Sequence, residues 1–248
     1  MKIIISPAKK MNLNTDILPW RNLPRLLPYT KTILKYLSGR EEQELKQIWK
    51  CSDAIVEENR KRLLTMDLEN RLSPAIFSYE GIQYQYLAPQ IMTKCQLDYL
   101  EENLRILSGL YGILRPFDGV RPYRLEMQSK IPKFQTKTLY AFWNREIYDI
   151  LTENDSIILN LASKEYSKVI EPYLEPGTKY VTCIFGEWVN GKLKEKGTYA
   201  KMARGEMVRF LAETQAKSLN EVKQFQGLGY RYEKILSTEN EFVFVKGE

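Results

Sequence analysis

The sequence predicts an α/β fold in which a mixed β-sheet is surrounded by helices. Two observations support this prediction. Short apolar segments typical of buried strands alternate with segments of helical periodicity along the whole chain. The 248 residues contain no internal repeat, low-complexity tract or linker-like composition, and this length allows a substantial core. We therefore expect a single domain over residues 1–248.

The amino-terminal half of the chain is predicted to contain one strand followed by helices. Residues 2–5 form a short apolar run that ends before a proline, which indicates a buried strand. Residues 11–28 are polar and interrupted by prolines, which favours a loop. Apolar side chains at helical spacing then predict helices over residues 29–37, 41–51, 53–65 and 97–107.

The carboxyl-terminal half alternates strands and helices more closely. Alternating or continuous apolar patterns predict strands over residues 123–127, 156–161 and 179–185. Helical patterns cover residues 139–151, 164–170 and 198–216, the last interrupted by Gly205. An Asn-Gly pair predicts a hairpin over residues 187–193, and two alternating segments, 230–235 and 241–246, predict a second one.

The composition excludes several kinds of catalytic site. The chain has no histidine, so Ser-His, Cys-His and histidine-metal sites are impossible and proton transfer falls to Glu, Asp, Lys, Tyr or Cys. The three cysteines, Cys51, Cys95 and Cys183, are too widely spaced for a disulfide framework or a zinc knuckle. We expect free thiols in a reducing compartment, with neither a metal site nor a cofactor.

Charge and hydropathy indicate where in the cell the protein acts and what kinds of partner it binds. No apolar run is long enough to span a membrane, and the first residues lack the apolar stretch of a signal peptide, so we expect a cytoplasmic protein without a membrane partner. The net charge is +6 and the pI is about 9.0, which suits nucleic acid or small phosphorylated ligands. A net positive charge alone does not identify a partner. A cluster of positive side chains would indicate a binding site for such anions.

A double-glycine segment, from Gly109 to Gly112, follows the helix predicted at 97–107. It loosely resembles the hairpin of a helix-hairpin-helix motif, in which backbone N–H groups contact DNA phosphates. The glycine spacing here is longer than is usual in that motif, and a glycine that only ends a helix explains the segment equally well.

Three arginines follow the glycines. Arg115, Arg121 and Arg124 surround prolines, and in the strand predicted at 123–127 Arg124 shares a face with Glu126. These groups form either a structural ion pair or an anion site that also carries an acid or base, since the guanidinium fork suits phosphate. We expect the arginines to line a basic cleft.

Polar groups at three other positions complete the candidate site. Ser6 and Lys9 follow the first strand, and Ser163 lies at a strand-to-helix turn, both places where sheet proteins position ligand groups. On the predicted helix 198–216, Lys201 and Arg204 share a face with a glycine that has no capping role, which suggests close approach by another backbone or a ligand.

These segments together resemble the YaaA family of bacterial cytoplasmic proteins. The matching motifs, in family order, are SPAK (6–9), LSGLYG (107–112), LRP with an aspartate (114–118), PYRLEM (122–127), FW (142–143), NLAS with EY (160–166) and K-x-A-R-G (201–205). One position departs from the family, because Ile82 follows Gly81 where an aspartate is usual. Any role of that aspartate is therefore in doubt for this chain.

The resemblance implies a role in protection from peroxide stress and binding of double-stranded DNA through a basic cleft. It also implies an α/β fold of the family's own type with a helix-hairpin-helix element, for which residues 104–115 are the best candidate. It attaches no reaction to the chain.

Two functions from different classes remain open. The first is a stress protein that binds duplex or branched DNA. Its candidate DNA- or anion-binding residues are Ser6, Lys9, Gly109, Gly112, Arg115, Arg121, Arg124, Ser163, Lys201, Arg204 and Arg209. The second is an enzyme acting on a nucleotide, a nucleobase or a damaged base in DNA. Here Lys9 is the base or nucleophile, Glu126 the acid or base, and Arg124 and Arg204 the anion clamp. Iron sequestration ranks last, because histidine and clustered cysteines are lacking.

Overall fold

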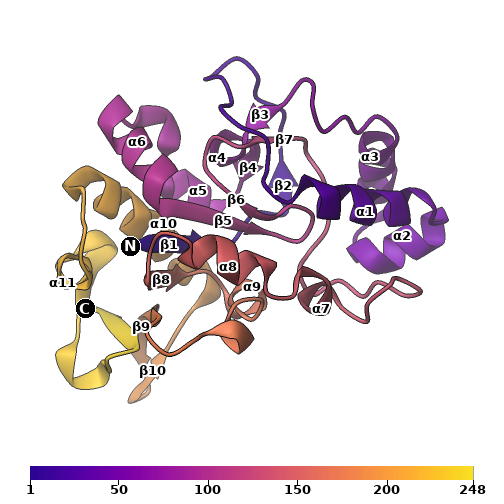
Figure 1. Ribbon diagram of the computed structural model, residues 1–248. Coiled ribbons are helices and arrows are strands. Elements are labelled where there is room, and N and C mark those ends of the chain that lie inside the picture. Colours follow the sequence, from indigo (N-terminus) through magenta and orange to yellow (C-terminus); the bar gives the residue numbers. More distant parts are fainter. Residues whose placement is uncertain (248) are drawn as a thin grey trace.

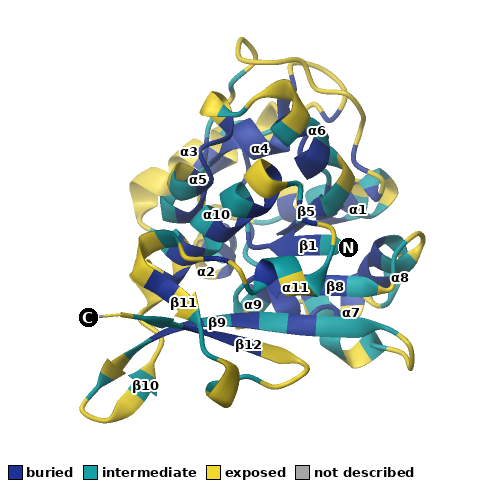
Figure 2. Ribbon diagram, turned by 90° about the vertical axis from the view of Figure 1, so that its left-hand side faces the viewer, coloured by how far each residue is buried: buried dark blue, intermediate teal, exposed yellow. Residues whose placement is uncertain are grey.

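The computed structural model describes residues 1–247 and confirms the predicted α/β fold with a mixed sheet. The strands of the main sheet are β1 (Lys2–Ile5), β5 (Leu104–Ser108), β6 (Gly112–Leu114), β8 (Ile157–Leu161), β9 (Lys179–Val189), β10 (Lys192–Lys194), β11 (Tyr230–Tyr232) and β12 (Glu241–Lys246). Within the described residues seven of these strands follow the order β11-β12-β9-β8-β1-β5-β6, and the eighth, β10, pairs with β9 (Figure 1 and Figure 2).

The centre of the sheet is parallel and its margins are antiparallel. β1 pairs in parallel with β5 on one side and β8 on the other, and β9 and β12 continue in the same direction. Ile3, Ile4 and Ile5 are fully buried, as the continuous apolar run requires in a parallel sheet covered on both faces. Because Ile5 is opposite Leu161 of β8, β1 and β8 end side by side at one edge of the sheet.

Helices cover both faces of the sheet. They are α1 (Leu27–Ser38), α2 (Glu42–Trp49), α3 (Asp53–Leu64), α4 (Ala75–Ser78), α5 (Ile82–Leu87), α6 (Lys94–Asn103), α7 (Leu139–Trp143), α8 (Glu146–Thr152), α9 (Lys164–Ser167), α10 (Gly197–Thr214) and α11 (Leu219–Val222). α8 lies in front of β1 in Figure 1, and the turned view of Figure 2 places α10 and α5 on the opposite side. None of the helices in residues 1–247 is long and apolar enough to cross a membrane.

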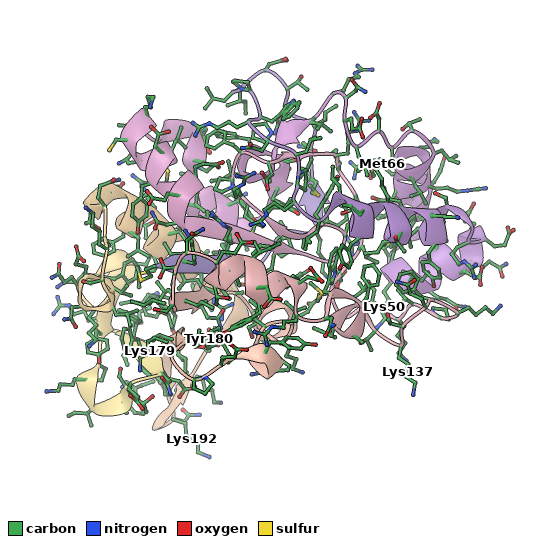
Figure 3. All side chains as sticks on the ribbon, viewed as in Figure 1. Lys50, Met66, Lys137, Lys179, Tyr180 and Lys192 are labelled. Carbon is green, nitrogen blue, oxygen red and sulfur yellow. The ribbon has the colours of Figure 1, made fainter. Side chains whose placement is uncertain are left out.

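Smaller elements complete the chain. The short strands β2 (Lys10–Met11) and β4 (Tyr79–Glu80) pair with each other, as do β3 (Ser73–Pro74) and β7 (Gly119–Val120). Single 3-10 turns occur at η1 (Pro89–Ile91), η2 (Glu171–Tyr173), η3 (Gly227–Gly229) and η4 (Lys234–Leu236). Lys137, on the segment before α7, and Lys192, in strand β10, project from the surface (Figure 3).

The structure corrects the prediction for residues 104–115. The helix expected at 97–107 ends as α6 at Asn103, and the next five residues form strand β5. β5 and β6 form an antiparallel hairpin, so this segment is a β-hairpin and not a helix-hairpin-helix element. The apolar residues of β5 match a helical spacing and a buried strand equally well, and pairing with the fully buried β1 decides for the strand.

Other element boundaries also differ from the prediction. Residues 123–127 alternate between buried and partly exposed as expected but form no strand. The helix predicted at 139–151 divides into α7 and α8 because Asn144 adopts a positive φ of 46°. Helix α10 runs through Gly205 without interruption, and α9 is shorter than the predicted 164–170. Both predicted carboxyl-terminal hairpins are confirmed.

Candidate functional site

A cavity of about 410 Å³ lies where β1 and β8 end, between these strand ends and helices α5, α9 and α10. Six residues that the sequence singles out line it together: Ser6, Lys9, Glu126, Ser163, Lys201 and Arg204. Parallel strands explain part of this convergence, because the carboxyl ends of neighbouring strands deliver their loops to one edge.

Two serines fix the base of the cavity. The backbone N–H of Ser163 donates to Oγ of Ser6 at 2.8 Å, and the Ser6 hydroxyl donates to Oγ of Ser163 at 3.2 Å. The Tyr84 hydroxyl donates to the backbone carbonyl of Ser6 at 3.0 Å. These bonds join the loops after β1 and β8 to helix α5 and hold the strand ends in register.

An ion-paired carboxylate occupies one side of the cavity. Oε1 of Glu126 lies 3.0 Å from Nζ of Lys9 and 3.1 Å from Nη2 of Arg124. The side chain of Glu126 is 16% exposed, whereas that of Lys9 is 64% exposed. Glu126 therefore faces the cavity from a protected position, and a ligand can reach Lys9 from solvent.

Helices α5 and α10 form the opposite wall. A β-carbon added to Gly205 would lie 2.1 Å from the backbone oxygen of Gln83, so the two helices touch at a point that only glycine allows. The sequence suggested close approach at Gly205 by another backbone or a ligand, and the structure shows that the backbone of α5 makes this approach. It also places Gln83 on α5 beside Arg204 on α10, and both side chains line the cavity.

The cavity carries charges of both signs. Four cations line it, namely Lys9, Lys10, Lys201 and Arg204, and three carboxylates, Glu80, Glu126 and Glu165, lie among them. Nζ of Lys10 pairs with Glu80 at 2.6 Å. Burial raises the pKa of Glu165 above its usual value, and the nearby charge of Glu126 adds to that effect. The site can bind an anion and also contains a carboxyl group suited to proton transfer.

Comparison with known proteins shows which family the chain belongs to. The sequence profile of the family described as "Peroxide stress protein YaaA" matches residues 1–236. The chain belongs to the YaaA family. A UPF0246 protein of Desulfitobacterium hafniense is 54% identical over 246 residues, covering 99% of this chain and 98% of the relative. UPF0246 proteins of Lachnoclostridium phytofermentans and Agathobacter rectalis are 51% and 50% identical, over 100% and 98% of this chain and 97% and 98% of theirs. The family description supports a role in peroxide stress.

Of the two glycines of the YaaA-type motif LSGLYG, Gly109 lies in the β5–β6 turn and Gly112 is the first residue of β6. Gly112 has a positive φ of 73°, and a β-carbon there would lie 2.9 Å from the ring of Trp143. At Gly109 an added β-carbon would lie 2.5 Å from the backbone oxygen of Leu125. Close packing therefore accounts for both glycines.

The structure places three candidate arginines of this YaaA-family chain away from the cavity. Nε of Arg115 pairs with Asp118 at 3.1 Å beside a different hollow. Arg121 donates to the backbone carbonyl of Arg71 at 3.0 Å, and Arg209 pairs with Glu213 at 2.8 Å. Arg124 remains next to the cavity through its bond to Glu126. The expected cleft containing all of these arginines does not form.

Sequence reasoning missed part of the site. Gln83 lies in α5, a helix of six residues whose sequence shows no periodicity long enough to predict it. Glu80 enters through the two-residue pairing of β2 with β4. Glu165 follows Ser163 in a motif shared with the family, and this was the only signal available for it.

Proposed function

We propose that this YaaA-family chain acts in peroxide stress by binding DNA, and that one nucleotide unit of the DNA enters the cavity at the ends of β1 and β8. The observation that carries the proposal is the convergence on one cavity of six polar residues from four separate segments of the chain. Ser6 and Lys9 come from the first strand-loop unit, whereas Lys201 and Arg204 come from α10.

The size of the cavity supports a single nucleotide rather than a duplex. A volume of about 410 Å³ falls within the roughly 300–1,000 Å³ of small-molecule sites. A DNA double helix is far too wide for it, so only a nucleotide turned out of the stack, or one at an unpaired position, fits inside. Branched DNA offers such positions without the full cost of unstacking.

The charges at the cavity mouth support contact with phosphate. Lys9 and Lys201 are exposed at the cavity, and Arg204 lines its wall. Lysine and arginine side chains that neutralise phosphates release counterions, so the resulting affinity is sensitive to salt. The net charge of +6 adds a long-range attraction for DNA.

A reaction on the bound nucleotide is a second candidate function, favoured by one observation. Glu126 is a mostly buried carboxylate inside the cavity, and a protein that only binds phosphate gains nothing from such a negative charge. In this reading Glu126 exchanges a proton with the ligand, and Lys9 interacts with the ligand once their ion pair opens. The two functions combine if the substrate is a base in DNA.

Salt-dependent DNA binding tests the first proposal. We expect fluorescence anisotropy of labelled duplex and branched DNA to show an affinity that falls steeply with salt. Lys9→Ala and Lys201→Ala should each reduce the slope of log affinity against log salt by about 1. Lys94→Ala is the matched control, because Lys94 is an exposed lysine paired with Asp98 on α6, away from the cavity. Absence of DNA binding, or an equal effect of the control, would refute the proposal.

A further inference from the structure

Gln83 is a buried polar side chain in the wall of the cavity. The residue is 7% exposed, and its amide nitrogen has no hydrogen-bond partner among residues 1–247. It lines the cavity described above. Leaving a buried donor unpaired is costly, whereas an apolar side chain of the same shape would avoid that cost.

Arg204 presents a second donor of the same kind. Its Nη2 bonds to Glu195 at 2.9 Å, but its buried Nε has no partner in the described part of the chain. Arg204 also lines the cavity. Two unpaired buried donors therefore belong to the same cavity wall.

The packing of this wall keeps the two donors in place. Gln83 lies on α5 and Arg204 on α10, and the helices touch where Gly205 meets the backbone oxygen of Gln83. The Tyr84 hydroxyl fixes α5 to the loop after β1. Binding through these donors requires the terminal groups of Gln83 and Arg204 to rotate toward the cavity, because both nitrogens are buried.

We infer that Gln83 and Arg204 together bind the oxygens of a phosphate group in the cavity. Both side chains offer N–H donors, and an arginine fork matches phosphate geometry. Gln83 acts as a neutral donor that selects an oxygen-rich group without adding charge. This inference rests on the proposed entry of a nucleotide, and the phosphate belongs either to the DNA backbone or to a free mononucleotide.

Substitution of Gln83 by leucine gives a test with two readouts. Gln83→Leu keeps the volume and removes the unpaired donor, so we expect a melting temperature equal to or above that of the wild type. We expect its affinity for deoxyadenosine 5′-monophosphate to fall roughly ten-fold, and that of Arg204→Met to fall further, because a bond to a charged group is lost. Gln85→Leu is the matched control, since Gln85 is an exposed glutamine on the same helix.

Isothermal titration with the monophosphate and with deoxyadenosine, the nucleoside, distinguishes the outcomes. Deoxyadenosine should bind all variants equally weakly, because it lacks the phosphate. A wild type that binds the monophosphate no better than the nucleoside, or a Gln83→Leu variant that binds both like the wild type, overturns the inference. A Gln83→Leu variant with a lowered melting temperature assigns Gln83 to packing and also overturns it.

Duplex and branched oligonucleotides separate this inference from the proposed function. If the monophosphate binds and its affinity depends on Gln83 while neither DNA binds, the phosphate site stands and the DNA-binding proposal falls. If DNA and the monophosphate both bind with wild-type affinity in Gln83→Leu and Arg204→Met, the DNA-binding proposal stands and the phosphate site falls. If the two variants lose affinity for DNA and for the monophosphate, the DNA-binding proposal and the phosphate site are both supported.

Discussion

Nζ of Lys9 lies 3.0 Å from Oε1 of Glu126 in the lining of the cavity, although the two residues are distant in the sequence. The same carboxylate oxygen of Glu126 also accepts a bond from Arg124 at 3.1 Å. One negative charge therefore restrains two cations at the place where we propose that DNA phosphate arrives. The ion pair is part of both proposed functions, DNA binding and a reaction on the bound nucleotide. Substitution of Glu126 distinguishes the two.

Neutralising Glu126 is expected to tighten DNA binding. In Glu126→Gln, Lys9 and Arg124 lose their anionic partner and become available to phosphate, so affinity should rise several-fold at low salt, and the salt dependence should steepen. Asp98→Asn is the matched control, because Asp98 is a partly exposed acid on α6 that also pairs with two cations, Arg21 and Lys94, and the change in net charge is the same. Equal tightening in both variants would place Glu126 outside the ligand site.

If Glu126 transfers a proton, Glu126→Gln should lower the survival of cells under peroxide even though it tightens DNA binding. A strain carrying Glu126→Gln should then lose protection although its protein binds DNA at least as tightly. Protection equal to the wild type would show that binding alone suffices and would remove the catalytic reading.

Gly205 is expected to be essential for the wall between α5 and α10. An alanine there would bring its β-carbon within 2.1 Å of the Gln83 backbone oxygen, which neither helix can avoid without moving. We expect Gly205→Ala to lower the free energy of unfolding by about 2–3 kcal/mol in urea titration.

Gly197 offers the matched control on the same helix. A β-carbon at Gly197, the first residue of α10, meets nothing within 4 Å. Gly197→Ala should therefore leave stability unchanged or raise it by up to about 1 kcal/mol, because alanine restricts the unfolded chain more than glycine. Similar stabilities for the two variants would contradict the packing argument.

Asp118 is expected to make stability depend on pH in a mildly acidic range. Burial raises the pKa of Asp118 to about 6 from its usual 3.8, although bonds from the Arg115 backbone and side chain act in the opposite direction. The folded chain then holds this proton more tightly than the unfolded chain. The contribution of Asp118 to stability should decrease as pH rises from about 4 to about 6 and stay constant above that.

Carbon NMR of the side-chain carboxyl group measures this titration directly. We expect its midpoint near pH 6, and the pH dependence of unfolding in this range should be weaker in Asp118→Asn. A midpoint below the usual value of 3.8 would show that the ion pair with Arg115 outweighs burial.

Much of the fold follows from the sequence because its strands and longer helices carry strong local patterns. The apolar run of β1 and the Asn-Gly turn between β9 and β10 were both predictable from local chemistry. The segment 104–108 was not, because its apolar spacing fits a helix and a buried strand equally, and only the pairing with β1 chooses between them. Contacts between distant segments decide such cases.

The site was predictable only where its residues follow strong elements. Ser6 and Ser163 come after buried strands, and parallel pairing brings them together. Gln83 lies in a short helix positioned by α10, so its place in the cavity depends on a tertiary contact that no local pattern encodes. Arg115 matched the expected anion site by residue type, but Asp118, three positions later, provides a nearer partner.

The three cysteines are expected to differ sharply in their reactivity toward a thiol reagent. Cys95 is exposed on α6, Cys51 is partly buried, and Cys183 in β9 is 1% exposed. Burial raises the pKa of Cys183 far above its usual range, and it raises that of Cys51 to a smaller extent. Since the thiolate is the reactive form, Cys95 should react first, Cys51 more slowly and Cys183 only after unfolding.

Ellman's reagent resolves these classes, and the result bears on how the chain acts under peroxide. Cys95→Ser should remove the fast phase, whereas Cys51→Ser should keep it and lose the slow phase. Peroxide oxidises thiolates preferentially, and burial disfavours the thiolate form of Cys51 and Cys183. We therefore expect each of the three single serine variants to keep peroxide protection. Loss of protection in Cys51→Ser alone would instead place oxidation next to Arg124 and Glu126, whose charges both act on the Cys51 thiol.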